Sequence, residues 1–174
     1  MVPVLQARST ELRPGARLLT AFTGATTGET GWEWLGGEFW HAACDLERDG
    51  VLSCEERLRI TLPTASRSID DIRAPFGAIG TFAGLALEHV EILQVPDPLW
   101  AEFQTSGDAR QFGLSHANAF RAWSGPTITR SLAGRADRVE VLDLLFGRFS
   151  ARLASAPQPH QPYLAVAILA KRAR

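Results

Sequence analysis

The hydrophobic pattern divides the chain into three predicted strands separated by groups of helices. Strands are expected over residues 16–23, 85–95 and 163–171, and the last is so uniformly apolar that we expect it to be covered on both faces. Helices are predicted over 2–13, 32–47, 68–76 and 138–153, with a further short helix capped by Ser53 and Glu56. Two or more helices are predicted between residues 99 and 132, with a break at Gly125-Pro126.

The beginning of this order is informative about the fold class. A helix that ends at Pro14-Gly15 and leads into a buried strand is the αβ step of a doubly wound α/β sheet. No cofactor-binding βα turn comes before it. The sequence therefore resembles the second half of such a sheet, with much of a substrate pocket and little of a cofactor site.

Composition narrows the possible partners. The 174 residues carry a formal net charge of −1, which gives no electrostatic footprint for nucleic acid or an anionic membrane. Cys44 and Cys54 match no zinc or redox spacing, and Arg8 and Glu11 interrupt any signal peptide. We therefore expect one domain, 1–174, in a cytoplasmic protein with reduced thiols that binds neither nucleic acid nor membrane.

Two local motifs suggest ligands. The glycines of Gly24–Gly31 follow the first strand but lack the spacing of a nucleotide loop, so this segment is interpreted as a connection. The segment from Asp45 to Glu56 has acids at loop positions 1, 3, 5 and 12 and glycine at 6, as in an EF-hand, and calcium binding by this helix–loop–helix is an alternative function. Its other interpretation is a helical corner with a Ser53 cap.

Aromatic residues are concentrated in two helices and at the last strand. Tryptophans and a phenylalanine cluster within residues 32–40, Phe120 and Trp123 are three residues apart, and Tyr163 is the only tyrosine. Each could be a core residue. Together they could line a flat apolar pocket for a small aromatic or aliphatic molecule. The four histidines share no metal-ligand spacing, and no catalytic nucleophile or general base stands out.

Three stretches, taken in order, resemble one family. They are Leu5 to Thr20; Asp45 to Ser53 with Leu62-Pro63 and Ser68 to Arg73; and Ala119 to Pro126 with the following helix and apolar strand. They are similar to the C-terminal part of the SABATH carboxyl methyltransferases, the salicylate, jasmonate and benzoate type, and to bacterial relatives of these enzymes. The calcium-like loop lies inside the second stretch.

The resemblance implies an α/β fold. We expect a partial class I methyltransferase (Rossmann-like) sheet of about three mixed strands, with the last strand between the other two and the first strand at an exposed edge. Residues 1–24 and 84–174 would form this partial sheet with its flanking helices, and 25–83 a mainly helical cap. The exposed edge predicts either a homodimer or pairing with a separately encoded N-terminal half.

The resemblance also implies an activity: transfer of a methyl group from S-adenosylmethionine to a small-molecule carboxylic acid. A carboxylate is already ionised at neutral pH, so positioning suffices and no catalytic side chain is assigned. The matching substrate-binding positions are Phe120, Trp123 and Tyr163, with Trp34 as an offset substitute for a pocket tryptophan. Ala65 and Gly125 replace other family residues, which departs from a salicylate-like pocket.

The family's glycine-rich loop and acidic ribose ligand have no counterpart in this sequence. The isolated chain is therefore expected to bind S-adenosylmethionine weakly or not at all, and the cofactor-binding residues stay unknown. A non-catalytic small-molecule binder that uses the aromatic cap alone is the main alternative. No metal site is assigned.

Overall fold

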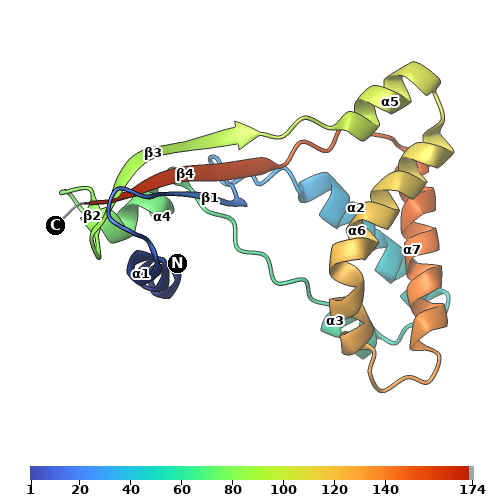
Figure 1. Cartoon of the computed structure of the whole chain (residues 1–174). Helices are drawn as coiled ribbons and strands as arrows, with labels where there is room; N and C mark the ends of the chain where they lie inside the picture. Colours follow the sequence, from blue (N-terminus) through green and yellow to red (C-terminus); the bar gives the residue numbers. More distant parts are fainter. Residues whose placement is uncertain (173–174) are drawn as a thin grey trace. The chain divides into compact units, whose positions relative to one another are not determined.

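The structure is a computed structural model that describes residues 1–172. Its elements, in chain order, are α1 (Val2–Glu11), β1 (Arg17–Thr23), α2 (Glu33–Arg48), α3 (Cys54–Arg59), α4 (Ile69–Arg73) followed by a 3₁₀ turn (Ala74–Phe76), β2 (Thr81–Phe82), β3 (Leu85–Gln94), α5 (Pro98–Ser106), α6 (Ala109–Ser131), α7 (Arg138–Ser155) and β4 (Tyr163–Lys171) (Figure 1). The α/β fold class is confirmed.

The contacts divide the chain into two compact units. The sheet unit comprises residues 1–31, 65–95 and the chain from 161 onward, and the helical unit comprises 32–64 and 96–160. The chain therefore passes from one unit to the other four times.

The sheet unit contains four strands in the order β1-β4-β3-β2 (Figure 1). The three expected strands are present, and the last of them lies between the other two as the resemblance implied. Each neighbouring pair is antiparallel, so β1 and β3 run in the same direction with β4 reversed between them. The fourth strand, β2, has only two residues and was not predicted, because it forms a tight hairpin with β3 through a turn at Ala83-Gly84.

One face of this sheet packs against helices. Leu5 of α1, Ile72 of α4 and Phe76 of the 3₁₀ turn form a buried cluster with Leu85 of β3 and with alternate residues of β4, which are Ala165, Ala167 and Leu169. The residues between these on β4 are only half-buried. The expectation that β4 is covered on both faces is therefore not met within the sheet unit.

The helical unit is built around α7. This helix packs against both α6 and α2, and its apolar face forms the core predicted for 138–153. Phe149 is fully buried, with its ring 5.4 Å from that of Phe39 and 5.3 Å from that of Phe120. The packing of these rings determines which faces of α2 and α6 are turned toward α7.

The predicted break at Gly125-Pro126 is wrong, because α6 continues through it to Ser131. Gly125 has no Cβ to collide with the proline ring, which is the clash that usually ends a helix before proline. The hydroxyl of Ser124 donates to the Phe120 carbonyl at 2.6 Å, and Thr129 donates to the Gly125 carbonyl at 2.9 Å. Packing against α7 therefore holds one long helix where local propensity favours two.

Candidate functional site

The helical unit contains an apolar cavity with a volume of about 240 Å³. Its wall is formed by α2, α6 and the extended segment that follows α3. The lining residues are Trp32, Gly36, Phe39, Trp40, Ala43, Ile60, Leu62, Thr64, Phe120 and Trp123. Pockets for drug-sized ligands start at about 300 Å³, so this cavity suits a single ring with short substituents.

Helical spacing places the aromatic wall. Trp32, Gly36 and Trp40 follow one another at intervals of four along the start of α2, and therefore share one face. Gly36 has open space where a side chain would begin, so its lack of a Cβ enlarges the cavity. On α6, Phe120 is buried, whereas Trp123 remains 46% exposed at the cavity wall.

Ring contacts hold these walls in place. The Trp32 and Trp123 rings meet edge to face with centroids 5.9 Å apart, and the Phe120 and Trp123 rings are 4.8 Å apart. The Arg57 guanidinium lies 4.5 Å from the centre of the Trp40 ring and is itself paired with Glu47. The cation–π contact and the ion pair together fix a tryptophan that is otherwise 42% exposed.

The chemistry of the cavity is apolar. Among its lining residues in the described part of the chain, none is charged, and the polar side-chain atoms are the Thr64 hydroxyl and the indole nitrogens of Trp32, Trp40 and Trp123. Burying a carboxylate there would leave it without a cation. The cavity therefore suits the hydrocarbon body of a ligand, with any charged group directed outward.

The predicted site residues occupy three different environments. Phe120 and Trp123 both line the cavity. Trp34 is outside its lining, with its ring 6.3 Å from Phe112 and 6.1 Å from His116. Tyr163 opens β4 in the sheet unit, where its amide donates to the Thr30 carbonyl at 3.1 Å. Substrate binding by Trp34 and Tyr163 stays a prediction.

Sequence analysis missed most of the aromatic wall that α2 contributes. Trp32 and Trp40 were noted only as members of a cluster, although their spacing of eight with Gly36 midway was a usable signal. Ile60 and Leu62 gave no such signal, because they belong to an extended segment that reaches the cavity through the tertiary fold.

A buried histidine lies next to the cavity-forming helices. His116 of α6 has its Nε2 3.5 Å from Asp97 Oδ2, and both side chains are about 5% exposed or less. Burial lowers the pKa of His116, and the attraction of Asp97 only partly opposes this effect. Asp97 also accepts from the amides of Leu99, Trp100 and His160, so this pair is a polar link between α5, α6 and the segment before β4.

The structure does not support calcium binding by Asp45–Glu56, because the acidic side chains of this segment form ion pairs with arginines. Arg152 and Arg48 each lie 2.9 Å from Asp45, and Arg148 lies 2.7 Å from Asp49. Arg135 is 3.2 Å from Glu56 and also donates to the Val51 carbonyl. In residues 1–172 no group of three or more histidine, cysteine, aspartate or glutamate side chains is arranged to hold a metal ion.

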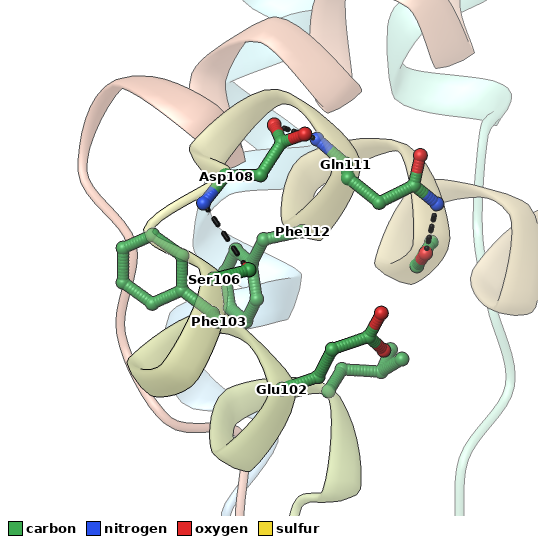
Figure 2. Close-up of a pocket in the computed structure, with 8 residues that line it drawn as sticks. Glu102, Phe103, Ser106, Asp108, Gln111 and Phe112 are labelled. Atoms are coloured by element: carbon green, nitrogen blue, oxygen red, sulfur yellow. Dashed lines mark hydrogen bonds between the residues drawn. The ribbon is translucent and has the colours of Figure 1, made fainter.

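A second hollow lies at the corner between α5 and α6, where Figure 2 shows Glu102, Asp108 and Gln111. Its volume is about 10 Å³, enough for one water molecule. Asp108 caps α6 through the Gln111 amide, and the Gln111 side chain donates to Ser115. This hollow is a helix corner rather than a ligand site.

The glycine-containing loop after β1 is packed against its neighbours in the sheet unit. Several backbone amides of this loop are already hydrogen-bonded to carbonyl groups. Thr26 and Glu29 bond to each other, Ala25 donates to the Arg67 carbonyl, and Gly24 donates to the Tyr163 carbonyl. Gly31 is pressed against Gln161, and a Cβ there would lie 2.3 Å from that carbonyl oxygen. The loop is thus a packed connection and offers no cradle for a cofactor.

No helix in the described residues is long and apolar enough to cross a membrane. No protein-family model matches the sequence, and no curated protein matches it significantly. Solved structures do share the fold. One is described as loganic acid methyltransferase with SAH; it superposes with a TM-score of 0.71 at 18% identity, over 98% of this chain and 46% of that chain. The chain therefore has a methyltransferase fold and spans less than half of this neighbour's length.

Proposed function

We propose that the chain is the acceptor-binding part of an S-adenosylmethionine-dependent carboxyl methyltransferase of the SABATH type. The observation that carries the proposal is the aromatic cavity between α2 and α6, which fits the body of a small acid. The likeness to a loganic acid methyltransferase supports the fold on which this cavity sits. The substrate class we propose is small carboxylic acids whose ring or chain is apolar.

In this proposal the chain binds and orients the acid. The aromatic walls exclude water from the apolar body, and the uncharged lining keeps the carboxylate at the mouth. The packed loop after β1 offers no cradle for S-adenosylmethionine, and in this proposal the cofactor would be held outside the described residues. The same cavity would serve a non-catalytic binder, so the assay must separate binding from methyl transfer.

The direct test is calorimetric titration of the purified chain with benzoic acid and, separately, with S-adenosylhomocysteine. We expect saturable binding of benzoic acid and none of S-adenosylhomocysteine. Adding S-adenosylmethionine and measuring methyl benzoate by mass spectrometry then tests whether the chain alone can transfer a methyl group. Failure to bind benzoic acid and other small apolar carboxylic acids would contradict the proposal. Ester formation by the chain alone would show that it holds the cofactor itself.

Trp123→Ala should weaken benzoic acid binding roughly tenfold, since loss of one aromatic wall at a buried contact is worth about 1–2 kcal/mol. Trp123 lines the cavity but is half-exposed, so the variant should still fold. The matched control is Trp100→Ala, because Trp100 packs on Phe103 and Phe112 away from the cavity. Equal weakening by both variants would show that binding occurs elsewhere.

A further inference from the structure

The sheet unit has a hollow of its own, which contains the only lysine of the chain. Its volume is about 820 Å³, and it lies between α1, the Ala83-Gly84 turn and the end of β4. Polar lining groups come from Gln6, Ser9 and Thr10 of α1 and from Lys171 and Arg172. None of the lining residues is acidic.

Lys171 points toward the helix-covered side of the sheet. It lies opposite Leu85 in the register and two residues after Leu169, both of which are fully buried on that side. Its Nζ donates to Ser9 Oγ at 2.8 Å, and Ser9, only 5% exposed, donates in turn to the Ala83 carbonyl. The ammonium group is thus held in place by a buried hydroxyl.

The Ala83-Gly84 turn lies close to the Lys171 ammonium and has an unusual backbone conformation. Ala83 has a φ of +52°, which is uncommon for a residue with a side chain, and Gly84 has a φ of +78°. A Cβ on Gly84 would lie 3.1 Å from Lys171 Nζ. The Gly84 carbonyl also accepts from the Arg172 amide at 3.0 Å, and Arg172 lines the same hollow as Lys171.

Neither cation has a counter-ion in the part of the chain that the structure describes. No ion pair joins Lys171 or Arg172 to a carboxylate among residues 1–172, and Glu11, the acid next to Thr10, is paired with Arg8 at 2.7 Å. A half-buried ammonium with a neutral hydroxyl as its partner is costly, because buried charges are normally paired. Among residues 1–172 the arrangement thus has two positive charges and no carboxylate paired with either of them.

We propose that this hollow binds a phosphate-type oxyanion. Lys171, Arg172 and Gln6 all line the hollow and carry side-chain N–H donors, two of which remain on the Lys171 ammonium, and two cations favour a dianion over a monovalent ion. The site is made entirely by the sheet unit and does not depend on the aromatic cavity. The group bound is either free phosphate or the phosphate of a larger ligand.

The test is titration of the full chain with inorganic phosphate at constant ionic strength, followed by calorimetry and thermal unfolding. Phosphate should bind saturably and raise Tm, whereas the same concentration of chloride should not. Lys171→Met should weaken phosphate binding roughly tenfold or more, the loss expected for one charge-assisted contact. Without phosphate, the Tm of the Lys171→Met variant should equal or exceed that of the wild type, because methionine removes a half-buried charge.

Arg73→Met is the matched control, because Arg73 is exposed in the same unit and its removal changes the net charge equally. Phosphate affinity should stay within about twofold of the wild-type value in this variant. Equal weakening in both variants, or no phosphate binding at all, would overturn the proposal. A lower Tm for Lys171→Met with no phosphate effect would also overturn it, by showing that Lys171 only supports α1.

A parallel titration with glycerol 3-phosphate identifies the source of the anion. Equal affinity for both compounds indicates a site for the free ion. Tighter binding of the ester indicates that the phosphate belongs to a larger molecule. Both results support an oxyanion site. If neither compound binds, the proposal is wrong.

Discussion

Gly113→Val should destabilise the helical unit by about 4 kcal/mol or more, at the upper end for a single substitution. Gly113 lies where α6 meets α7, and a Cβ at this position would be 2.3 Å from the Ser150 carbonyl oxygen and 2.9 Å from the Ala154 amide. Both atoms belong to the backbone of α7, so no side chain can rotate away. The helices would have to separate and expose the aromatic core around Phe149. Urea unfolding followed by far-UV circular dichroism measures the loss.

Gly147→Ala is the matched control for this prediction. Gly147 is exposed on α7 and has open space around its missing Cβ. Alanine favours a helix over glycine by about 1 kcal/mol, so this variant should be more stable than the wild type. If both variants were destabilised equally, close approach of the two helices would not be the cause.

Arg152→Met should cost about 2 kcal/mol, between the values for exposed and for buried ion pairs. Arg152 is 2.8 Å from Glu38 and 2.9 Å from Asp45, and the Asp45 side chain is only 12% exposed. Removing the arginine leaves Glu38 without its partner on α7, and leaves Asp45 with Arg148 of α7 only at 3.8 Å. The matched control is Arg48→Met, because Arg48 also pairs with Asp45 but is 73% exposed and should contribute less than about 1 kcal/mol.

The same contact predicts how stability depends on pH. Burial would raise the pKa of Asp45, but hydrogen bonds from Arg152 and Arg48 outweigh it and hold the pKa below its ordinary value of 3.8. Because the pKa of Asp45 is lowered in the folded state, its ion pairs stabilise the fold fully above pH 3.8. This stabilisation is lost as the pH falls through the lowered pKa. Arg152→Met should therefore move the acid-unfolding midpoint to higher pH. An unchanged midpoint would mean that Arg152 contributes no ion-pair stability.

Sequence reasoning succeeded where the determinant was local. The strand around Ala167 is uniformly apolar, the capping box of Ser53 and Glu56 forms as its spacing indicates, and a helix starts at Ser68 as predicted. It failed where distant residues decide. Pro126 lies inside a helix because α7 supports that helix, and the two-residue strand β2 exists only through its hairpin with β3.

The candidate site shows the same division. The acids at Asp45 and Asp49 match a calcium loop in sequence, but their partners Arg148 and Arg152 lie about a hundred residues further along. Local spacing cannot reveal such neutralisation. Phe120 and Trp123 were identified because a resemblance indicated them, whereas the choice between Trp32, Trp34 and Trp40 depends on which face of α2 meets α6.

The position of β4 in the sheet has a consequence for synthesis on the ribosome. It is the last of the strands along the chain, yet it supplies every main-chain partner that β1 has in the sheet and most of those of β3. Until residue 171 has left the exit tunnel, which takes roughly ten seconds or more after β1 is made, β1 and β3 cannot bond to their shared neighbour. The nascent chain therefore carries β1 without a partner strand and β3 paired only with the two-residue strand β2. Expression yield should accordingly depend on chaperones that shield nascent strands more than on the final stability of the helices.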